Sequence, residues 1–219
     1  MLCVRHRVGG ATSRGNQREW LYSISMARPV KFSVDQILDG AAIAVRERGN
    51  EASIADIAAA SGVPSGSIYH RFSSRREVFV RLWIRSIRRF QEGFIQAMGD
   101  DSPENAVIAS ALHIPTFCRD NPLDAFAMTL FHQWELAQDA PESCVEDVLH
   151  INDGINAATA RLIDRLCGSR DDRRDGLIVT ATRMCPYGLV RPYLGREIPR
   201  WIDEAVVASA TSISRLAAE

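Results

Sequence analysis

The sequence predicts an all-α protein of about nine helices, with a small N-terminal domain of three helices and a larger helical domain after it. Three observations support this prediction. Apolar residues recur every three or four positions over long stretches, which is the spacing of one helix face. Glycine and proline residues interrupt those stretches. No segment alternates apolar and polar residues with the β-branched enrichment that is typical of strands.

Capping residues and breaks delimit the expected helices. Three segments begin with a capping box, in which a serine and an acidic or amide side chain three positions later bind the free N–H groups of the first turn. The three serines are Ser33, Ser53 and Ser74. The expected helices span residues 33–48, 53–60, 64–72, 74–98, 104–120, 122–138, 142–167, 172–190 and 199–217.

Residues 53–72 have the pattern of a helix-turn-helix, in which the second helix lies in the major groove of DNA. Ala58 is small enough to let the two helices approach. Gly62 tolerates the positive φ that a sharp turn favours. Val63 and Ile68 anchor the second helix inward, so its other face is free to contact a partner.

The charge distribution favours the same interpretation. Residues 1–90 hold 15 Lys and Arg against 7 Asp and Glu, whereas residues 91–219 hold 11 against 20. A basic end on an acidic body is typical of a module that faces phosphate. The fourth helix also has a basic face, which is more often ion-paired or solvated than a phosphate track. It consists of Arg81, Arg85, Arg88 and Arg89.

The turn and the residues after it resemble the TetR family of bacterial regulators. Family members share a small hydrophobic-Ala-Gly-Val turn, a short helix that ends in Tyr-x-x-Phe, and an F-x-S-basic-x-x-hydrophobic continuation. The matching residues here are Ile57, Ala58, Gly62, Val63, Gly66, Tyr69, Phe72, Ser74, Arg75 and Val78. The sequence departs from the family at three positions. Pro64 stands where Ser or Thr is usual, and Ser65 stands where a basic residue is frequent. Arg75 replaces the usual Lys. The first two departures leave the base-reading details open.

The resemblance implies a homodimer on double-stranded operator DNA with a palindromic site. The residues it assigns to DNA binding are Ser53, Ser65, Gly66, Ser67, Tyr69, His70 and Arg75. Gly66 would let the backbone approach the groove, and the neighbouring serine hydroxyls would reach base edges or phosphates. Tyr69 and His70 would contact phosphate or a thymine methyl group. Arg75 would pair with phosphate at the start of the next helix.

The resemblance further implies a pocket for an unknown small-molecule effector and a dimer interface made by the last two helices. The candidate ligand-binding residues are Phe117, Phe131, Trp134 and Asn156, with Tyr187, His113 and His132 as further candidates. A stripe on helix 199–217, together with part of the preceding helix, predicts a four-helix dimer seam, and a monomer core is the alternative. The stripe is Ile202, Val206, Ala210, Ile213 and Ala217, with Leu177, Ala181 and Met184.

We therefore expect three regions: a loose arm over 1–25, a helix-turn-helix domain over 26–78, and a ligand-sensing and dimerisation domain over 79–219. The arm lacks periodicity, and Met26 after it resembles a natural start; a basic arm that touches DNA is the alternative. No apolar run has the length of a membrane span or a secretion signal, so we expect a cytoplasmic protein without a membrane partner.

The predicted function is a sequence-specific transcriptional regulator, a repressor released from its operator by a small ligand. Activation remains open, because the sequence does not fix the operator's position. The alternative is a degenerate helix-turn-helix dimer that binds a protein and not DNA. No nucleophile elbow, phosphate-binding Gly-Lys loop or paired zinc histidines occur, so we expect neither an enzyme nor a cofactor. The five cysteines lie far apart, and a metal site at His113, Cys118 and His132 would need convergence in the fold.

Overall fold

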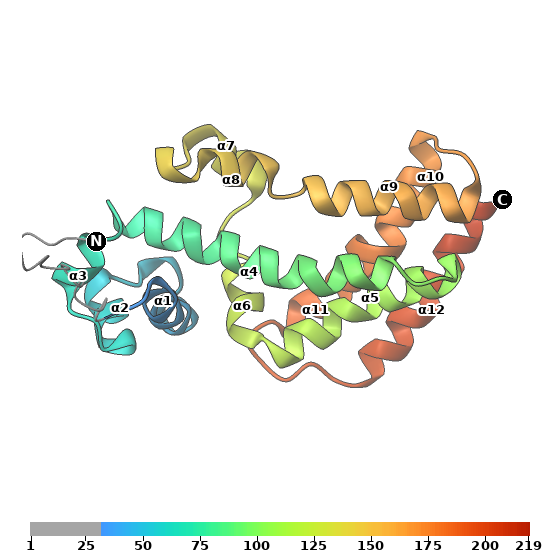
Figure 1. The fold of residues 1–219 in the computed structure, drawn as a ribbon. Helices are drawn as coiled ribbons and strands as arrows, with labels where there is room; N and C mark the ends of the chain where they lie inside the picture. Colours follow the sequence, from blue (N-terminus) through green and yellow to red (C-terminus); the bar gives the residue numbers. More distant parts are fainter. Residues whose placement is uncertain (1–31) are drawn as a thin grey trace, which may run out of the picture. The chain divides into compact units, whose positions relative to one another are not determined.

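The structure, a computed structural model, describes residues 32–219 (Figure 1). Every regular element within that range is a helix, which confirms the all-α prediction. The predicted arm over 1–25 and the first residues of the predicted helix-turn-helix domain lie outside the described residues.

The first helices begin close to their predicted positions. They are α1 (Val34–Arg48), α2 (Ile54–Ser61), α3 (Ser65–Tyr69) and α4 (Arg75–Met98), with a 3₁₀ turn, η1 (Gly49–Glu51), between α1 and α2. Each of the four α-helices starts one residue after the predicted start, because the capping serines and Pro64 are the flanking residues of these helices.

The remaining helices follow the break at Gly99. They are α5 (Pro103–Asp120), α6 (Pro122–Ala127), α7 (Gln133–Asp139), α8 (Val145–His150), α9 (Asp153–Cys167), α10 (Asp172–Val179), α11 (Cys185–Val190) and α12 (Trp201–Ala218). Shorter elements between them are the 3₁₀ turns η2 (Glu142–Cys144) and η4 (Arg191–Tyr193) and the π-helical segment η3 (Thr180–Met184).

Two predicted helices are divided because side chains bind their backbone carbonyls. The helix expected over 122–138 ends after α6, where Trp83 Nε1 donates to the carbonyl of Met128 at 3.2 Å. The helix expected over 142–167 divides between α8 and α9, where Gln91 Nε2 donates to the carbonyl of Ile151 at 2.9 Å. These donors lie on α4, so the divisions depend on tertiary packing and leave no mark on local periodicity.

The third divided helix contains the π-helical segment. Pro186 has no N–H, so the bond that an α-helix would make to the carbonyl of Thr182 is absent. The N–H of Cys185 instead donates to the carbonyl of Thr180, five residues back. The helix expected over 172–190 therefore becomes α10, η3 and α11.

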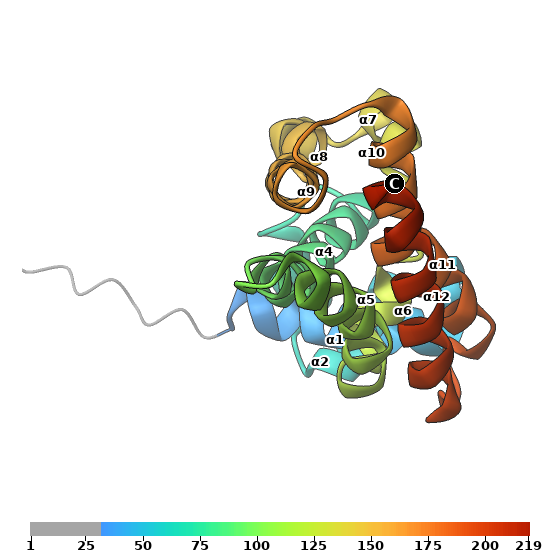
Figure 2. The ribbon, with the colours of Figure 1, turned by 90° about the vertical axis from the view of Figure 1, so that its right-hand side faces the viewer.

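Helix α4 contributes to all three clusters of buried apolar residues. Its first turns pack with α1–α3 through Val78 and Leu82, its middle packs with α7 and α8 through Trp83, and its end packs with α5 and α9 through Phe94. Figure 1 shows α4 running from the α1–α3 group, past α6, to α5 and α9, and Figure 2 views the molecule from the end where α9 and α12 lie. Because α4 is continuous across residue 78, the predicted domain boundary there stays a prediction.

Candidate nucleic-acid interface

Helix α2 has the predicted residues at both ends, a capping box at its start and Gly62 in the turn to α3. The Ser53 hydroxyl accepts a hydrogen bond from the Asp56 N–H at 3.2 Å, and the Asp56 carboxylate accepts one from the Ser53 N–H at 2.8 Å. Gly62 has a φ of +69°, and its N–H donates to the carbonyl of Ala58 at 3.0 Å. That conformation costs a residue with a side chain about 1–2 kcal/mol. The glycine therefore fixes the direction in which α3 leaves the turn.

A close approach between α1 and α2 positions the turn from behind. A Cβ at Gly40 would lie 2.5 Å from the Cβ of Ser61, so a larger residue would push the helices apart. Gln36 Nε2 donates to the carbonyl of Ser61 at 2.9 Å, whereas the predicted capping box had placed this side chain on Ser33. Sequence analysis missed Gly40, because a glycine inside a helix does not show what packs against it.

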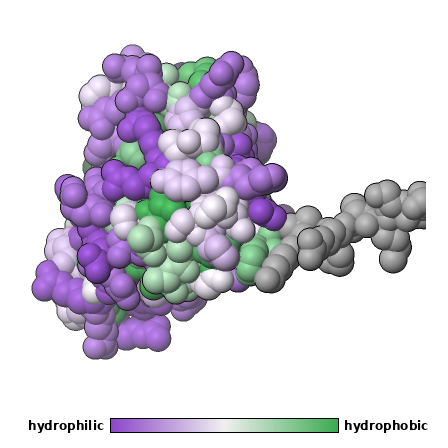
Figure 3. Space-filling view, turned by 90° about the vertical axis from the view of Figure 1, so that its left-hand side faces the viewer, coloured by the Kyte–Doolittle hydropathy of each residue, from purple (hydrophilic) through white to green (hydrophobic). Residues whose placement is uncertain are grey.

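The two sides of α3 differ in exposure. Ile68 is fully buried, with Phe72 and Val63 beside it in the core. The exposed side consists of four of the predicted DNA-contacting residues: Ser65, Gly66, Tyr69 and His70. Tyr69 is 58% exposed, although it is one of the larger apolar side chains. Figure 3 views this end of the molecule, where hydrophilic side chains surround a smaller apolar area.

Gly66 has no packing role within the described chain. A Cβ at this position would meet no atom within 4 Å. A glycine inside a helix lowers helix stability by about 1 kcal/mol relative to alanine. Since the fold does not require the missing side chain, Gly66 suits the close approach of a partner to α3.

The other three predicted DNA residues already have protein partners or are half-buried. Ser53 closes the capping box of α2, and Ser67 is half-buried on α3. Arg75 is exposed, but its Nη1 donates to the carbonyls of Asn50 at 2.9 Å and Ala52 at 3.0 Å. The Nε and Nη2 donors of Arg75 remain for a phosphate.

Arg71 is a residue that the motif comparison did not single out. Its Nη2 donates to the carbonyl of Phe32 at 2.7 Å, which fixes the start of the described chain beside α3. Together with Arg75, it places positive charge beside the exposed face of α3. The signal available in the sequence was the basic cluster itself.

The basic face of α4 is ion-paired, as favoured from the sequence. Arg81 pairs with Glu77 on the same helix at 3.0 Å. The other three reach other helices: Arg85 to Asp39 at 2.8 Å, Arg88 to Asp147 at 2.5 Å and Arg89 to Asp124 at 3.1 Å. These pairs neutralise the stripe and join α4 to α1, α8 and α6.

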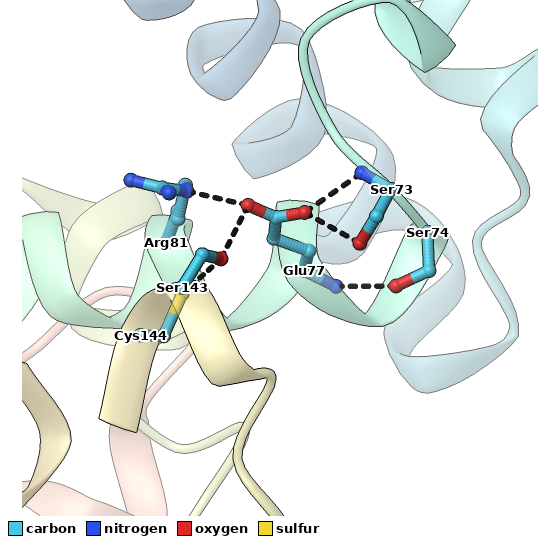
Figure 4. Close-up of polar contacts among 6 residues, drawn as sticks. All are labelled: Ser73, Ser74, Glu77, Arg81, Ser143 and Cys144. Carbon is cyan, nitrogen blue, oxygen red and sulfur yellow. Dashed lines mark hydrogen bonds and ion pairs between the residues drawn. The ribbon is translucent and has the colours of Figure 1, made fainter.

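A buried carboxylate joins the start of α4 to the body (Figure 4). Glu77 is 4% exposed and accepts hydrogen bonds from the N–H and hydroxyl of Ser73, each at 2.7 Å, and from the Ser143 hydroxyl at 2.7 Å. Burial alone would raise the pKa of Glu77, but these bonds and the one from Arg81 lower it to about 2. The carboxylate is therefore ionised at neutral pH.

A cavity of about 780 Å³ opens between α4, α5, α6 and the segment from η3 to η4. Most of the lining side chains are apolar, and Cys118 has its pKa raised to about 11 by burial. Of the four predicted ligand residues, Phe131 lines the cavity, and Phe117 lies behind it, with its ring 5.3 Å from that of Phe90. Tyr187 and His132 also line it.

Trp134 and Asn156 lie away from this cavity. Trp134 is 68% exposed on α7, and Asn156 is exposed on α9; neither side chain lines the cavity. Both were selected by residue type, which carries no information on the direction of a side chain. His113 also points elsewhere: its Nε2 lies 2.9 Å from the carbonyl of Phe90, and burial lowers its pKa despite that bond.

The prediction that the apolar stripe on α12 forms a dimer seam is wrong. Ile202, Val206 and Ala210 are fully buried within the chain and pack in the same cluster as Phe94 of α4. The alternative from the sequence, a monomer core, is the observed arrangement. The preceding helix was expected to add Leu177, Ala181 and Met184 to the seam. Of these three, only Met184 is strongly exposed, at 64%.

Two further features of the described chain bear on function. Across residues 32–219, no three His, Cys, Asp or Glu side chains come together as a metal site would require. None of the helices in that range combines the length and apolar character of a membrane span.

Comparison with known proteins agrees with the geometry of the turn. Residues 37–82, which include α2, α3 and the start of α4, match the family model for bacterial regulatory proteins of the tetR family. The chain carries a TetR-family DNA-binding domain. No curated protein matches the chain at a significant level.

Solved transcriptional regulators, among them the TetR-family regulator PfmR, share the fold over most of this chain. PfmR from Thermus thermophilus aligns with a TM-score of 0.62 and 18% identity, covering 82% of this chain and 97% of its own. A transcriptional regulator from Rhodococcus sp. Rha1 aligns with a TM-score of 0.62 and 17% identity, covering 86% and 99%. FadR from Bacillus subtilis, solved in complex with stearoyl-CoA, aligns with a TM-score of 0.55 and 16% identity, covering 85% of this chain and 98% of its own.

Proposed function

We propose that this chain is a cytoplasmic, sequence-specific transcriptional regulator, a repressor that a small molecule releases from double-stranded operator DNA. The observation that supports DNA contact is the exposed side of α3. There Ser65, Gly66, Tyr69 and His70 have no core role, while Ile68 is fully buried on the opposite side. A short helix held by its inner face, after a turn fixed by Gly62, is the geometry that enters a major groove.

The proposed DNA-contacting set is Ser53, Ser65, Gly66, Ser67, Tyr69, His70 and Arg75. The exposed members reach the groove, and Arg75 uses its Nε and Nη2 donors for phosphate. Ser53 contributes mainly through the cap that holds α2 in place. No catalytic role is proposed for any of them.

The proposed regulator is a homodimer, which places two copies of α3 on a palindromic operator. The exposed face of α12 supports this assignment, since it has small residues between two large apolar ones. Trp201 is 53% exposed and Leu216 is 46% exposed, with Ala208 and Ser212 exposed between them. This face is the side of α12 away from the buried stripe.

The proposed effector site is the 780 Å³ cavity, whose volume lies in the range of small-molecule pockets. It is lined by residues of α6 such as Phe126, and the same helix packs on α1. A ligand that prefers one position of α6 would therefore shift the spacing of the two α3 helices in the dimer. The complex of FadR with stearoyl-CoA is a precedent for a ligand on this fold.

The test is fluorescence anisotropy of the full chain titrated onto labelled DNA from upstream of its own gene, with scrambled DNA as the control. We expect saturable, salt-sensitive binding to the upstream DNA with two chains per site, because several phosphate contacts release counterions. Absence of binding to either DNA at low salt would contradict the proposal and favour a module that binds protein instead.

A further inference from the structure

Two arginines line the cavity without an acidic partner. Arg183 lies in η3 and is half-buried, and Arg191 lies at the start of η4 and is exposed. Within residues 32–219, neither guanidinium forms an ion pair with a carboxylate, and Nε of Arg183 is buried with no hydrogen-bond partner. No Asp or Glu side chain lines the cavity.

This arrangement differs from that of Arg119, which lines the neighbouring cavity. In the adjoining cavity of about 450 Å³, Arg119 pairs with Asp203 at 2.8 Å and 3.0 Å and also donates to two carbonyls. Burial of an unpaired charge costs free energy, and burial lowers the pKa of Arg183. The free protein therefore keeps a positive charge where a bound anion would stabilise it.

The rest of the cavity suits an apolar group. Phe90, Ile114, Phe126, Phe131 and Tyr187 form much of its wall. The two cavities share three lining residues, so they adjoin and offer room for an extended ligand; the shared residues are Cys118, Ala125 and Leu194. Burial keeps the Cys118 thiol protonated, since it raises its pKa to about 11. Cys118 therefore adds no negative charge that would repel an anion.

We propose that the cavity binds an amphipathic organic anion, whose carboxylate or phosphate group pairs with Arg183 and Arg191 while its apolar body lies among the aromatic side chains. The planar guanidinium groups match the geometry of both kinds of headgroup. Because Arg191 is exposed and Arg183 is half-buried, the headgroup lies toward the rim and the apolar body deeper. This inference rests on the proposed function, since it names the ligand class of the same cavity.

The test uses probes of known structure and no DNA. The uncharged dye N-phenyl-1-naphthylamine is bound to the full chain, and its fluorescence is followed as octanoate, octyl phosphate or 1-octanol is added. Both anions are expected to displace the dye at concentrations at least about tenfold lower than the alcohol, because charge-assisted hydrogen bonds add to the same apolar contact. The ratio between octanoate and octyl phosphate identifies the preferred headgroup.

Variants assign the preference to the two arginines. In the double variant Arg183→Gln with Arg191→Gln, the anions and the alcohol should displace the dye at equal concentrations. The variant Arg183→Lys should keep part of the preference for anions. Arg161→Gln, which changes an exposed arginine on α9 outside both cavities, should behave like the wild type. The melting temperature of Arg183→Gln should equal or exceed that of the wild type, since the substitution removes an uncompensated buried charge.

Equal displacement by the alcohol and the anions in the wild type would overturn the inference, as would an anion preference that survives in the double variant. Failure of both anions to displace the dye would also overturn it. Because the assay contains no DNA, these outcomes are independent of whether the chain binds an operator. A chain that binds the anions but no DNA would contradict the proposed function alone.

Discussion

The Ser143 hydroxyl donates a hydrogen bond to Oε1 of Glu77 at 2.7 Å, which joins η2 to the first turn of α4. The other carboxylate oxygen accepts from Ser73, in the segment that follows α3. One buried carboxylate thus connects the end of the helix-turn-helix to the body. A change in the position of η2 would be transmitted to the start of α4 through this group.

Protonation of Glu77 should destabilise the fold at acid pH. Its pKa in the folded protein is about 2, against 4.5 in the unfolded chain, so its contribution is complete above 4.5 and is lost as the pH falls toward 2. We expect the free energy of urea unfolding to fall more steeply over this range in the wild type than in Glu77→Gln. The difference should reach about 1–3 kcal/mol.

The matched control for this prediction is Glu92→Gln, which changes an exposed carboxylate on the same helix. This variant should follow the wild-type pH dependence. If Glu77→Gln and Glu92→Gln lose stability in parallel with the wild type, the buried network does not stabilise the ionised carboxylate.

Two glycines around the turn should respond differently to alanine. Gly62→Ala should lower the free energy of unfolding by about 1–2 kcal/mol, because its φ is +69°. Gly66→Ala should leave stability unchanged or raise it by up to about 1 kcal/mol, since the new Cβ meets no atom. Chemical denaturation of both variants measures these changes.

The same pair separates folding from DNA binding. Gly66→Ala should weaken operator binding although the protein is fully folded, because the added methyl group lies on the face of α3 that approaches DNA. An unchanged dissociation constant for Gly66→Ala would remove this residue from the interface.

A charge on the exposed face of α12 should dissociate the proposed dimer. Ala208 is exposed between Trp201 and Leu216, so Ala208→Glu should prevent close packing of two chains without disturbing the monomer core. Light scattering after size exclusion should give the monomer mass for this variant. Ala157→Glu, at an exposed alanine on α9, should stay dimeric; a dimer in Ala208→Glu would place the interface elsewhere.

The helix-turn-helix could be predicted from the sequence because its signals are local. The Ser53 cap, the left-handed Gly62 and the inward Ile68 lie within one short segment, and each has a direct conformational meaning. The close approach at Gly40 could not be predicted, since it depends on which residue of α2 lies opposite.

The cavity could be predicted only in part, because its walls come from segments far apart in the chain. Phe131 was found by its residue type, and Trp134 was selected on the same ground although it faces outward. Arg183 was missed because it lies within the π-helical segment η3, whose geometry depends on Pro186. The buried stripe on α12 shows the same limit: periodicity identifies an apolar face but not what covers it.

The measurement that tests the central claim most directly is the anisotropy of operator DNA titrated with the wild type, Tyr69→Phe and Tyr69→Ala. Tyr69 is 58% exposed, so both variants should unfold like the wild type. Tyr69→Ala should lose about 1–3 kcal/mol of binding free energy per chain. Tyr69→Phe should show the same loss if the hydroxyl binds phosphate, and a smaller one if the ring contacts a thymine methyl group. Wild-type affinity in Tyr69→Ala would contradict the assignment of α3 as the recognition helix.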